Sequence, residues 1–246
     1  MNKLFVFGDS FAGLSDNPPE WAWQVDLARR LKLDLYNISH NGASAEWLTL
    51  KIIEFYDKIE EGDIVIALLP FWNRVCIWPE DPDFTHVYQY REDDPRWQKK
   101  TNKEIQAYKD YFYFLYNKEL TMAKMYSYCA WIDKLSHRLK HKPLLIYTRE
   151  FNKFKNLPIE NCAEATGNLF AKSVLEFENE KIWDELTKDG GFRDPRLSHL
   201  CKPNHATLAD KIYNYYSKNE VVNLNKDFKT GFLNQYNFEE DNEQIR

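Results

Sequence analysis

The sequence has few cysteines, no excess of positive charge and no long apolar run. No Cys-x-x-Cys pair occurs among its four cysteines, which are Cys76, Cys129, Cys162 and Cys201. The pattern therefore indicates neither a zinc site nor a disulfide framework. The chain of 246 residues has a net charge of −5 and a pI near 5.8, whereas domains that bind nucleic acid are typically basic. We therefore expect free thiols and no nucleic-acid partner.

Membrane and metal signals are also scarce. The longest apolar run, residues 64–72, is too short to span a bilayer. The first expected strand begins so soon after Met1 that no room remains for a signal peptide, and we expect a soluble, cytoplasmic protein with no membrane partner. His137 and His141 lie four residues apart in an expected helix, but no third ligand accompanies them. We expect neither a metal nor an organic cofactor.

Strand and helix patterns alternate through the first third of the chain. Apolar runs predict strands at 4–7 and 64–69, with a short strand at 34–39 between them. Helical spacing of apolar residues predicts a helix from about 18 to 33 and a second helix capped by Ser44. The stripe of the first helix consists of Ala22, Val25, Ala28 and Leu31. This alternation is typical of an α/β fold with parallel strands and right-handed crossovers.

The remaining elements are spaced less regularly. A fourth strand is predicted at 143–148, a weaker fifth at 173–177, a short helix at 182–186 and a final helix at 204–216. We expect a single domain over residues 1–218, with an insertion at about 75–141, and a polar C-terminal tail over 219–246.

The expected insertion is irregular and aromatic-rich in its first part and helical from about residue 103. Its aromatic residues, with those just before it, include Trp72, Trp78, Trp97 and the run 111–114. Such rings form either the core of the insertion itself or a lid whose faces hold substrate. Trp72 and Trp78 follow the third strand, and we expect these two to contact substrate.

Ser10 follows the first expected strand within the motif Gly-Asp-Ser-Phe. Ligands of open α/β sheets bind beyond the carboxyl ends of the strands, where a nucleophile is well placed, although these residue types also form ordinary turns. A serine nucleophile needs a base that a carboxylate or carbonyl orients. The loop before the last helix offers His199 with Asp194.

Three hydrogen-bond donors follow the first three strands and could bind an oxyanion. They are the backbone N–H groups of Ser10 and Gly42 and the side-chain amide of Asn73. Gly42 is also explained as a turn glycine and Asn73 as a capping residue. The order of these residues along consecutive parallel strands favours the catalytic interpretation.

These motifs resemble those of the SGNH, or GDSL, hydrolase family. Residues 8–11 are similar to its first block, residues 37–44 to its second, Asn73 to the asparagine of its third, and residues 199–209 to its last. The resemblance implies a three-layer α/β/α sandwich with a mostly parallel five-stranded, flavodoxin-like sheet and an aromatic-rich lid. It implies a serine esterase that works through an acyl-enzyme.

The roles that the resemblance implies are specific. Ser10 attacks the ester, His199 transfers the proton and Asp194 orients His199. Ser10, Gly42 and Asn73 bind the oxyanion. Asp194 lies five residues before His199, whereas the family places its aspartate three before, so a backbone carbonyl or Asp189 is an alternative partner.

The third block also departs from the family, because it lacks the usual glycine and carries Arg74 after the asparagine. Arg74 either binds an anionic substrate group or pairs with Asp81 or another carboxylate of the lid. We group Asp9, Trp72, Arg74 and Trp78 as substrate-binding residues, and we expect Asp9 also to brace the serine loop. His205 suits a structural role.

The expected substrate is an ester of a short acyl group, such as acetyl, on a carbohydrate or another polar small molecule. Two alternatives remain open. One is a binding or structural module that keeps the fold without catalysis, and the other is an acyltransferase that uses the same residues.

Overall fold

Five parallel strands form a single sheet in the part of the chain that the structure describes. The structure is a computed structural model, and it describes residues 2–13, 20–71, 74, 101–148, 157–169, 200 and 202–228. The strands are β1 (Lys3–Gly8), β2 (Asp34–Ser39), β3 (Ile64–Leu69), β4 (Leu144–Tyr147) and β5 (Ala163–Asn168), in the order β2-β1-β3-β4-β5. The α/β class and the parallel sheet expected from the sequence are confirmed.

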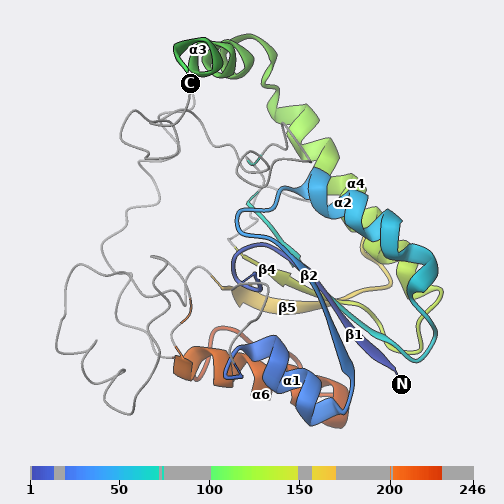
Figure 1. The fold of residues 1–246 in the computed structure, drawn as a ribbon. Coiled ribbons are helices and arrows are strands. Elements are labelled where there is room, and N and C mark those ends of the chain that lie inside the picture. Colours follow the sequence, from blue (N-terminus) through green and yellow to red (C-terminus); the bar gives the residue numbers. More distant parts are fainter. Residues whose placement is uncertain are drawn as a thin grey trace, which may run out of the picture.

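Helices cover both faces of the sheet (Figure 1). One face carries α1 (Trp23–Leu31) and α6 (Lys202–Lys218), and the other carries α2 (Ala45–Phe55) and α4 (Lys118–Ser136). The sheet therefore lies between two helical layers.

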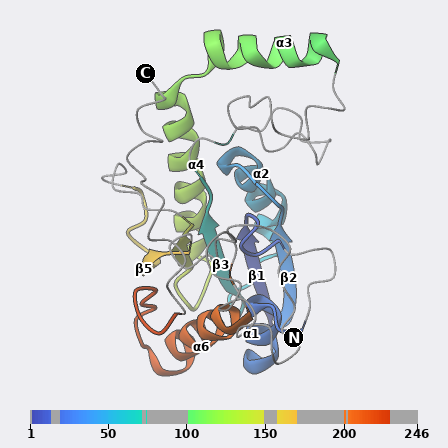
Figure 2. The ribbon, with the colours of Figure 1, turned by 90° about the vertical axis from the view of Figure 1, so that its left-hand side faces the viewer.

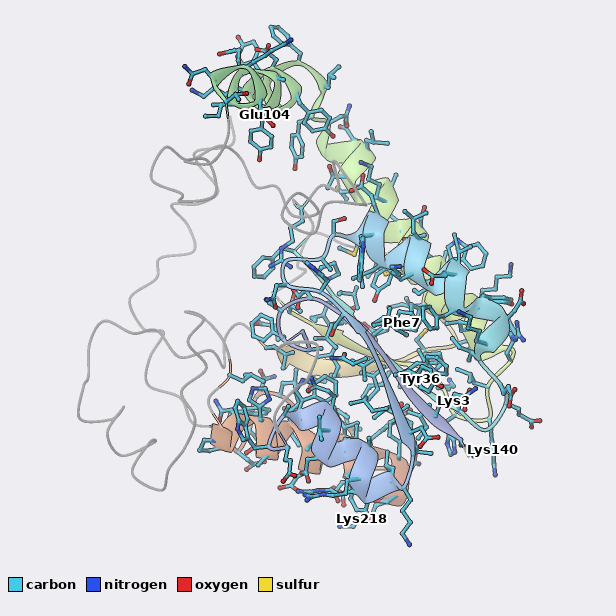
Figure 3. All side chains as sticks on the ribbon, in the orientation of Figure 1. Lys3, Phe7, Tyr36, Glu104, Lys140 and Lys218 are labelled. Atoms are coloured by element: carbon cyan, nitrogen blue, oxygen red, sulfur yellow. The ribbon has the colours of Figure 1, made fainter. Side chains whose placement is uncertain are left out.

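Alternate residues of β1 supply the two apolar cores. Leu4 and Val6 pack with the cluster on the α1 and α6 side, whereas Phe5 and Phe7 pack with the cluster on the α2 and α4 side; Phe7 is labelled in Figure 3. All four side chains are fully buried. Burying a side chain of this size stabilises the fold by about 1.5–3 kcal/mol, so β1 is fixed firmly at the centre of the sheet.

Helix α1 begins later than expected, whereas Ala22, Ala28 and Leu31 of its expected stripe do lie in or against the core. It begins at Trp23, with Ala22 as its N-cap, rather than near residue 18. Trp23 and Leu27 are its fully buried apolar residues, while Val25 of the expected stripe is only half-buried. The large Trp23 side chain sets the buried face, because it removes far more apolar area from water than Val25 could.

Helix α2 begins as the sequence predicts. The Ser44 hydroxyl accepts a hydrogen bond from the backbone N–H of Trp47 at 3.3 Å, which makes Ser44 the N-cap. The helix passes into a short 3₁₀ turn, η1 (Tyr56–Lys58), and the chain then reaches β3 through the buried Ile59.

The helical half of the expected insertion belongs in part to the main fold. It consists of α3 (Asn102–Asp110), a π-helical turn η4 (Tyr111–Leu115) and α4. Met125, Tyr128, Ile132 and Leu135 of α4 are fully buried in the core shared with α2, so α4 is the crossover helix between β3 and β4. Helix α3, in contrast, extends beyond the sheet, as Figures 1 and 2 show. Residues 75–100 lie outside the described part of the chain.

The last strand and the C-terminal region also differ from expectation. The fifth strand described is at 163–168, and the segment 173–177 lies outside the described residues. Residues 219–228, which we expected in a polar tail, pack on the sheet through Val222, Leu224 and Phe228. Backbone hydrogen bonds of 2.9 and 2.8 Å join Thr166 to Val222 and Leu224. The folded domain therefore extends to at least residue 228.

Candidate functional site

The strand order places the switch point of a doubly wound sheet between β1 and β3. From β1 the chain crosses to β2 on one side, and from β2 it crosses back past β1 to β3. The segments that leave β1 and β3 lead to helices on opposite faces, α1 and α4. Ligands of doubly wound sheets bind at this point, outside the carboxyl ends of the strands.

Ser10 lies in a tight turn directly after β1. The backbone carbonyl of Asp9 accepts hydrogen bonds from the N–H groups of Ala12 at 2.9 Å and Gly13 at 2.8 Å. The Asp9 side chain closes the same turn, because its Oδ1 accepts from the Phe11 N–H at 3.1 Å. Ser10 is 7% exposed and Asp9 is fully buried. The motif therefore forms a compact turn whose shape Asp9 fixes, as expected.

Two side-chain amides hold the far side of this turn. The carbonyl of Ala12 accepts from Gln24 Nε2 of α1 at 2.7 Å and from Asn37 Nδ2 of β2 at 3.0 Å. Asn37 is oriented in turn by Ser39, whose hydroxyl donates to Asn37 Oδ1 at 2.6 Å. Hydrogen bonds from two different elements thus fix where the Ser10 turn ends.

The turn that contains Gly42 begins beside the end of β1. The N–H of His40 donates to the Gly8 carbonyl at 3.1 Å, and the N–H of Ala43 donates to the His40 carbonyl at 3.0 Å. Gly42 has a φ of 76°, a conformation that glycine adopts far more readily than other residues. The structure therefore brings the Gly42 turn next to the motif that contains Ser10.

Arg74 connects these turns to the end of β3. Its Nη1 lies 2.8 Å from Asp9 Oδ2 and 3.3 Å from the Ala43 carbonyl oxygen. Its guanidinium carbon is 4.5 Å from the centre of the Phe71 ring, and its backbone N–H donates to the Phe71 carbonyl at 3.2 Å. Arg74 is 5% exposed. A carboxylate partner of Arg74 is thus Asp9 of the serine turn.

His205 is built into the packing between α1 and α6. Its Nδ1 accepts a hydrogen bond from the backbone N–H of Trp23 at 3.3 Å, its ring is edge-on to Trp21, and it is 1% exposed. Trp23 Nε1 donates to the Phe11 carbonyl at 2.9 Å. The first turn of α6 is therefore tied through Trp23 to the turn that contains Ser10, which is the structural role we expected for His205.

The other expected site residues lie outside the described part of the chain. They are His199, Asp194 and its substitute Asp189, Asn73, Trp72 and Trp78, together with Asp81. Leu200, which adjoins His199 in the sequence, is described and is buried in the same core as Phe11 and Ala12.

His137, His141 and the Cys129 thiol suit catalysis poorly at this edge of the sheet. His137 and His141 follow the C-terminal end of α4, close in sequence to Lys140, which Figure 3 places at the edge where the strands begin. Burial raises the pKa of the Cys129 thiol to about 12, with the charge of Glu164 adding to the effect, so this thiol is protonated at neutral pH and a poor nucleophile. Ser10 is better placed than either group.

Metal and membrane features can be judged over the same described residues. Within them, no three His, Cys, Asp or Glu side chains gather closely enough to hold a metal ion. None of the helices described combines the length and apolar character needed to cross a membrane.

Neither the Asp9–Arg74 pair nor the burial of Gln24 was predicted from the sequence. Asp9 follows the first apolar strand and Arg74 follows the third, and this shared position at the ends of strands is the signal that could have suggested their pairing. Gln24 falls on the helix face that carries Trp23 and Leu27, where a polar residue is unexpected unless it has a specific hydrogen bond.

Comparison with models of protein families finds no match to this chain, and comparison with curated proteins finds none either.

Proposed function

We propose that the protein is a serine esterase of the SGNH type. The observation that carries this proposal is the Ser10 turn, which follows β1 at the switch point and adjoins the Gly42 turn through the hydrogen bond from His40 to Gly8. A hydroxyl and two candidate backbone donors are then available at the ends of neighbouring strands. This combination is what acyl transfer to a serine requires.

In the proposed reaction, Ser10 Oγ attacks the carbonyl carbon of the ester and His199 takes the hydroxyl proton. The tetrahedral oxyanion accepts hydrogen bonds from the Ser10 and Gly42 N–H groups and from the Asn73 amide. His199 then gives its proton to the leaving alcohol, and the acyl-enzyme remains. Water then attacks the carbonyl carbon of the acyl-enzyme while His199 takes its proton, and collapse of the second tetrahedral intermediate releases the acid and returns the proton to Ser10. Asp194 orients His199 in both steps.

The packing at the start of α6 supports His199 as the base. Leu200 is buried with Phe11, and His205 is hydrogen-bonded to Trp23, which contacts the same serine turn. The chain therefore passes close to this turn just after His199. His205 is a weaker candidate, because its buried Nδ1 is already occupied by the Trp23 N–H.

The proposed substrate carries a short acyl group on a polar alcohol such as a carbohydrate. Trp72 and Trp78 would contact it from the segment that follows β3, since aromatic rings pack well on sugar rings and on small acyl groups. Rates of hydrolysis that rise steeply from acetyl to octanoyl esters would contradict this substrate class.

Covalent labelling tests the proposal directly. A fluorophosphonate should modify the wild-type protein at Ser10, and Ser10→Ala should abolish both labelling and the hydrolysis of 4-nitrophenyl acetate. Ser217→Ala is a matched control, because Ser217 lies on α6 and its hydroxyl donates to the Tyr213 carbonyl of the same helix at 2.7 Å. It should label like the wild type.

An unlabelled wild-type protein would overturn the proposal and favour a binding module with the same fold. Products identified in the presence of alcohol acceptors distinguish the remaining alternative. Acyl groups found on the acceptor rather than as free acid would identify an acyltransferase.

A further inference from the structure

Arg74 joins the three loops that follow β1, β2 and β3. Its Nη1 contacts Asp9 Oδ2 in the serine turn at 2.8 Å and the Ala43 carbonyl beside Gly42 at 3.3 Å. Its own backbone lies in the third loop, where its N–H bonds to the Phe71 carbonyl. One guanidinium therefore links every described loop of the candidate site.

The Asp9–Arg74 pair is buried, and Asp9 is used on both carboxylate oxygens. Oδ2 accepts from Arg74, while Oδ1 accepts from the Phe11 N–H within the serine turn. Asp9 is fully buried and Arg74 is 5% exposed. Charge-assisted hydrogen bonds of this kind are short and geometrically specific. The direction of the Asp9 side chain, and with it the turn that it closes, therefore depends on Arg74.

Stability alone is a weak reason for such a pair. Replacing a buried ion pair with well-packed apolar residues is often neutral or stabilising, whereas removing one partner is strongly destabilising. A buried pair beside a candidate nucleophile is better explained by the geometry that it imposes. Small displacements of reacting groups cost much more in rate than in stability.

We propose that Arg74 is a positioning residue that aligns the Ser10 and Gly42 N–H groups. It orients the Ser10 N–H group through Asp9 and the Gly42 N–H group through the Ala43 carbonyl. This inference rests on the proposed esterase function, and it assigns Arg74 and Asp9 to the framework of the oxyanion site rather than to contact with substrate. The low exposure of both side chains supports that assignment.

The test compares Arg74→Met, Asp9→Asn and the double variant. Each single variant should lower kcat and the rate of fluorophosphonate labelling roughly 100-fold, with KM unchanged, and should also unfold at lower urea concentration. The double variant removes both charges, so it should regain much of the lost stability. Its kcat should stay low, because the link between the loops is still absent.

Arg30→Met is the matched control. Arg30 also makes an ion pair with a buried aspartate, since its Nη2 is 2.6 Å from Asp26 Oδ2, but both residues lie on α1, and the ion pairs described for Arg30 join it only to Asp26 and to Asp210 of α6. The control should lower stability and leave kcat unchanged. If the single variants fail to fold, the double variant and the control still decide the question.

Three results would overturn the inference. If the double variant recovered kcat as well as stability, the Asp9–Arg74 pair would stabilise the fold without positioning the site. A selective rise in KM for an acyl group that carries a carboxylate, relative to a neutral one, would make Arg74 a substrate-binding residue. Normal labelling of Arg74→Met would show that the alignment does not depend on Arg74. Absence of labelling in the wild-type protein would instead defeat the esterase proposal itself.

Discussion

Gly8 shows why one residue type is required just before the serine turn. Its φ is not among the positive values of the described glycines, which occur at Gly42 and Gly167. A Cβ at Gly8 would lie 3.2 Å from Leu68 Cβ and 3.3 Å from Ala12 Cβ. Both atoms are attached directly to backbone, so neither can swing away. Gly8 is therefore needed for close packing between β1, β3 and the serine turn.

We predict that Gly8→Ala lowers the free energy of unfolding by about 1–3 kcal/mol, the usual cost of overpacking a tight site. The added methyl group would push Leu68 or Ala12 away, and moving Ala12 would also disturb the turn. Urea unfolding monitored by circular dichroism measures the loss. A Gly8→Ala protein as stable as the wild type would show that this contact relaxes at no cost.

At this scale the sequence predicts residues that follow local patterns. The place of Ser10 after a strand, the Ser44 cap and the turn at Gly42 each depend on a few neighbouring residues. The Asp9–Arg74 pair joins positions 65 residues apart. Opposite charges at such separation are too common in any sequence to identify a pair before the order of the strands is known.

Between elements, Arg30 connects α1 to α6 through charge, and Asp26 is its partner on α1. Arg30 pairs with Asp26 on its own helix and with Asp210 on α6, and Arg29 also contacts Asp26. Burial alone would raise the pKa of Asp26, but the hydrogen bonds from Arg30 and Arg29 outweigh it and hold the pKa below the ordinary value of 3.8. Ionised Asp26 therefore stabilises the folded state.

Because the pKa of Asp26 is lower in the folded state, its contribution is fully present above about pH 4 and is lost as the pH falls through the folded value. We predict that Asp26→Asn lowers stability at pH 7 and weakens the dependence of stability on pH at acid values. Urea unfolding of both proteins between pH 7 and pH 3 measures this. Parallel curves over the whole range would contradict the role given to Asp26.

Among the elements, the first four strands were predicted close to their observed bounds and β5 was not. Strands β1 and β3 are buried on both faces and read as continuous apolar runs, so their bounds were nearly correct. Strand β5 carries Glu164, Thr166 and Gly167 and lies at the edge of the sheet. Its pairing comes from neighbours in space rather than from its own hydrophobicity, which explains why it was not predicted.

At the scale of the whole molecule, residues 219–228 complete the core on the α1 and α6 side. Leu224 is fully buried, whereas Val221 in the same segment is 72% exposed. We predict that Leu224→Ala lowers the free energy of unfolding by about 2–5 kcal/mol, and that Val221→Ala changes it little. Equal effects of the two substitutions in thermal unfolding would show that this segment does not contribute to the core.

The fold class followed from the sequence because alternating strands and helices allow few arrangements. The extent of the domain, in contrast, did not follow from the sequence. The segment after residue 218 is mostly polar, and its few apolar side chains join the same core cluster as Leu4 and Val6 from the opposite end of the chain. Only the assembled sheet identifies those positions as core.

The strand order also determines when each part of the proposed site becomes available during synthesis. Strands β2, β1 and β3 are neighbours in the sheet, and all three come from residues 3–69. Chains fold from the N-terminal side as they emerge from the ribosome, so the Ser10 and Gly42 turns are framed early. The proposed base, His199, emerges about 130 residues after β3. A nascent chain would thus carry an unactivated serine until about four-fifths of it has been made.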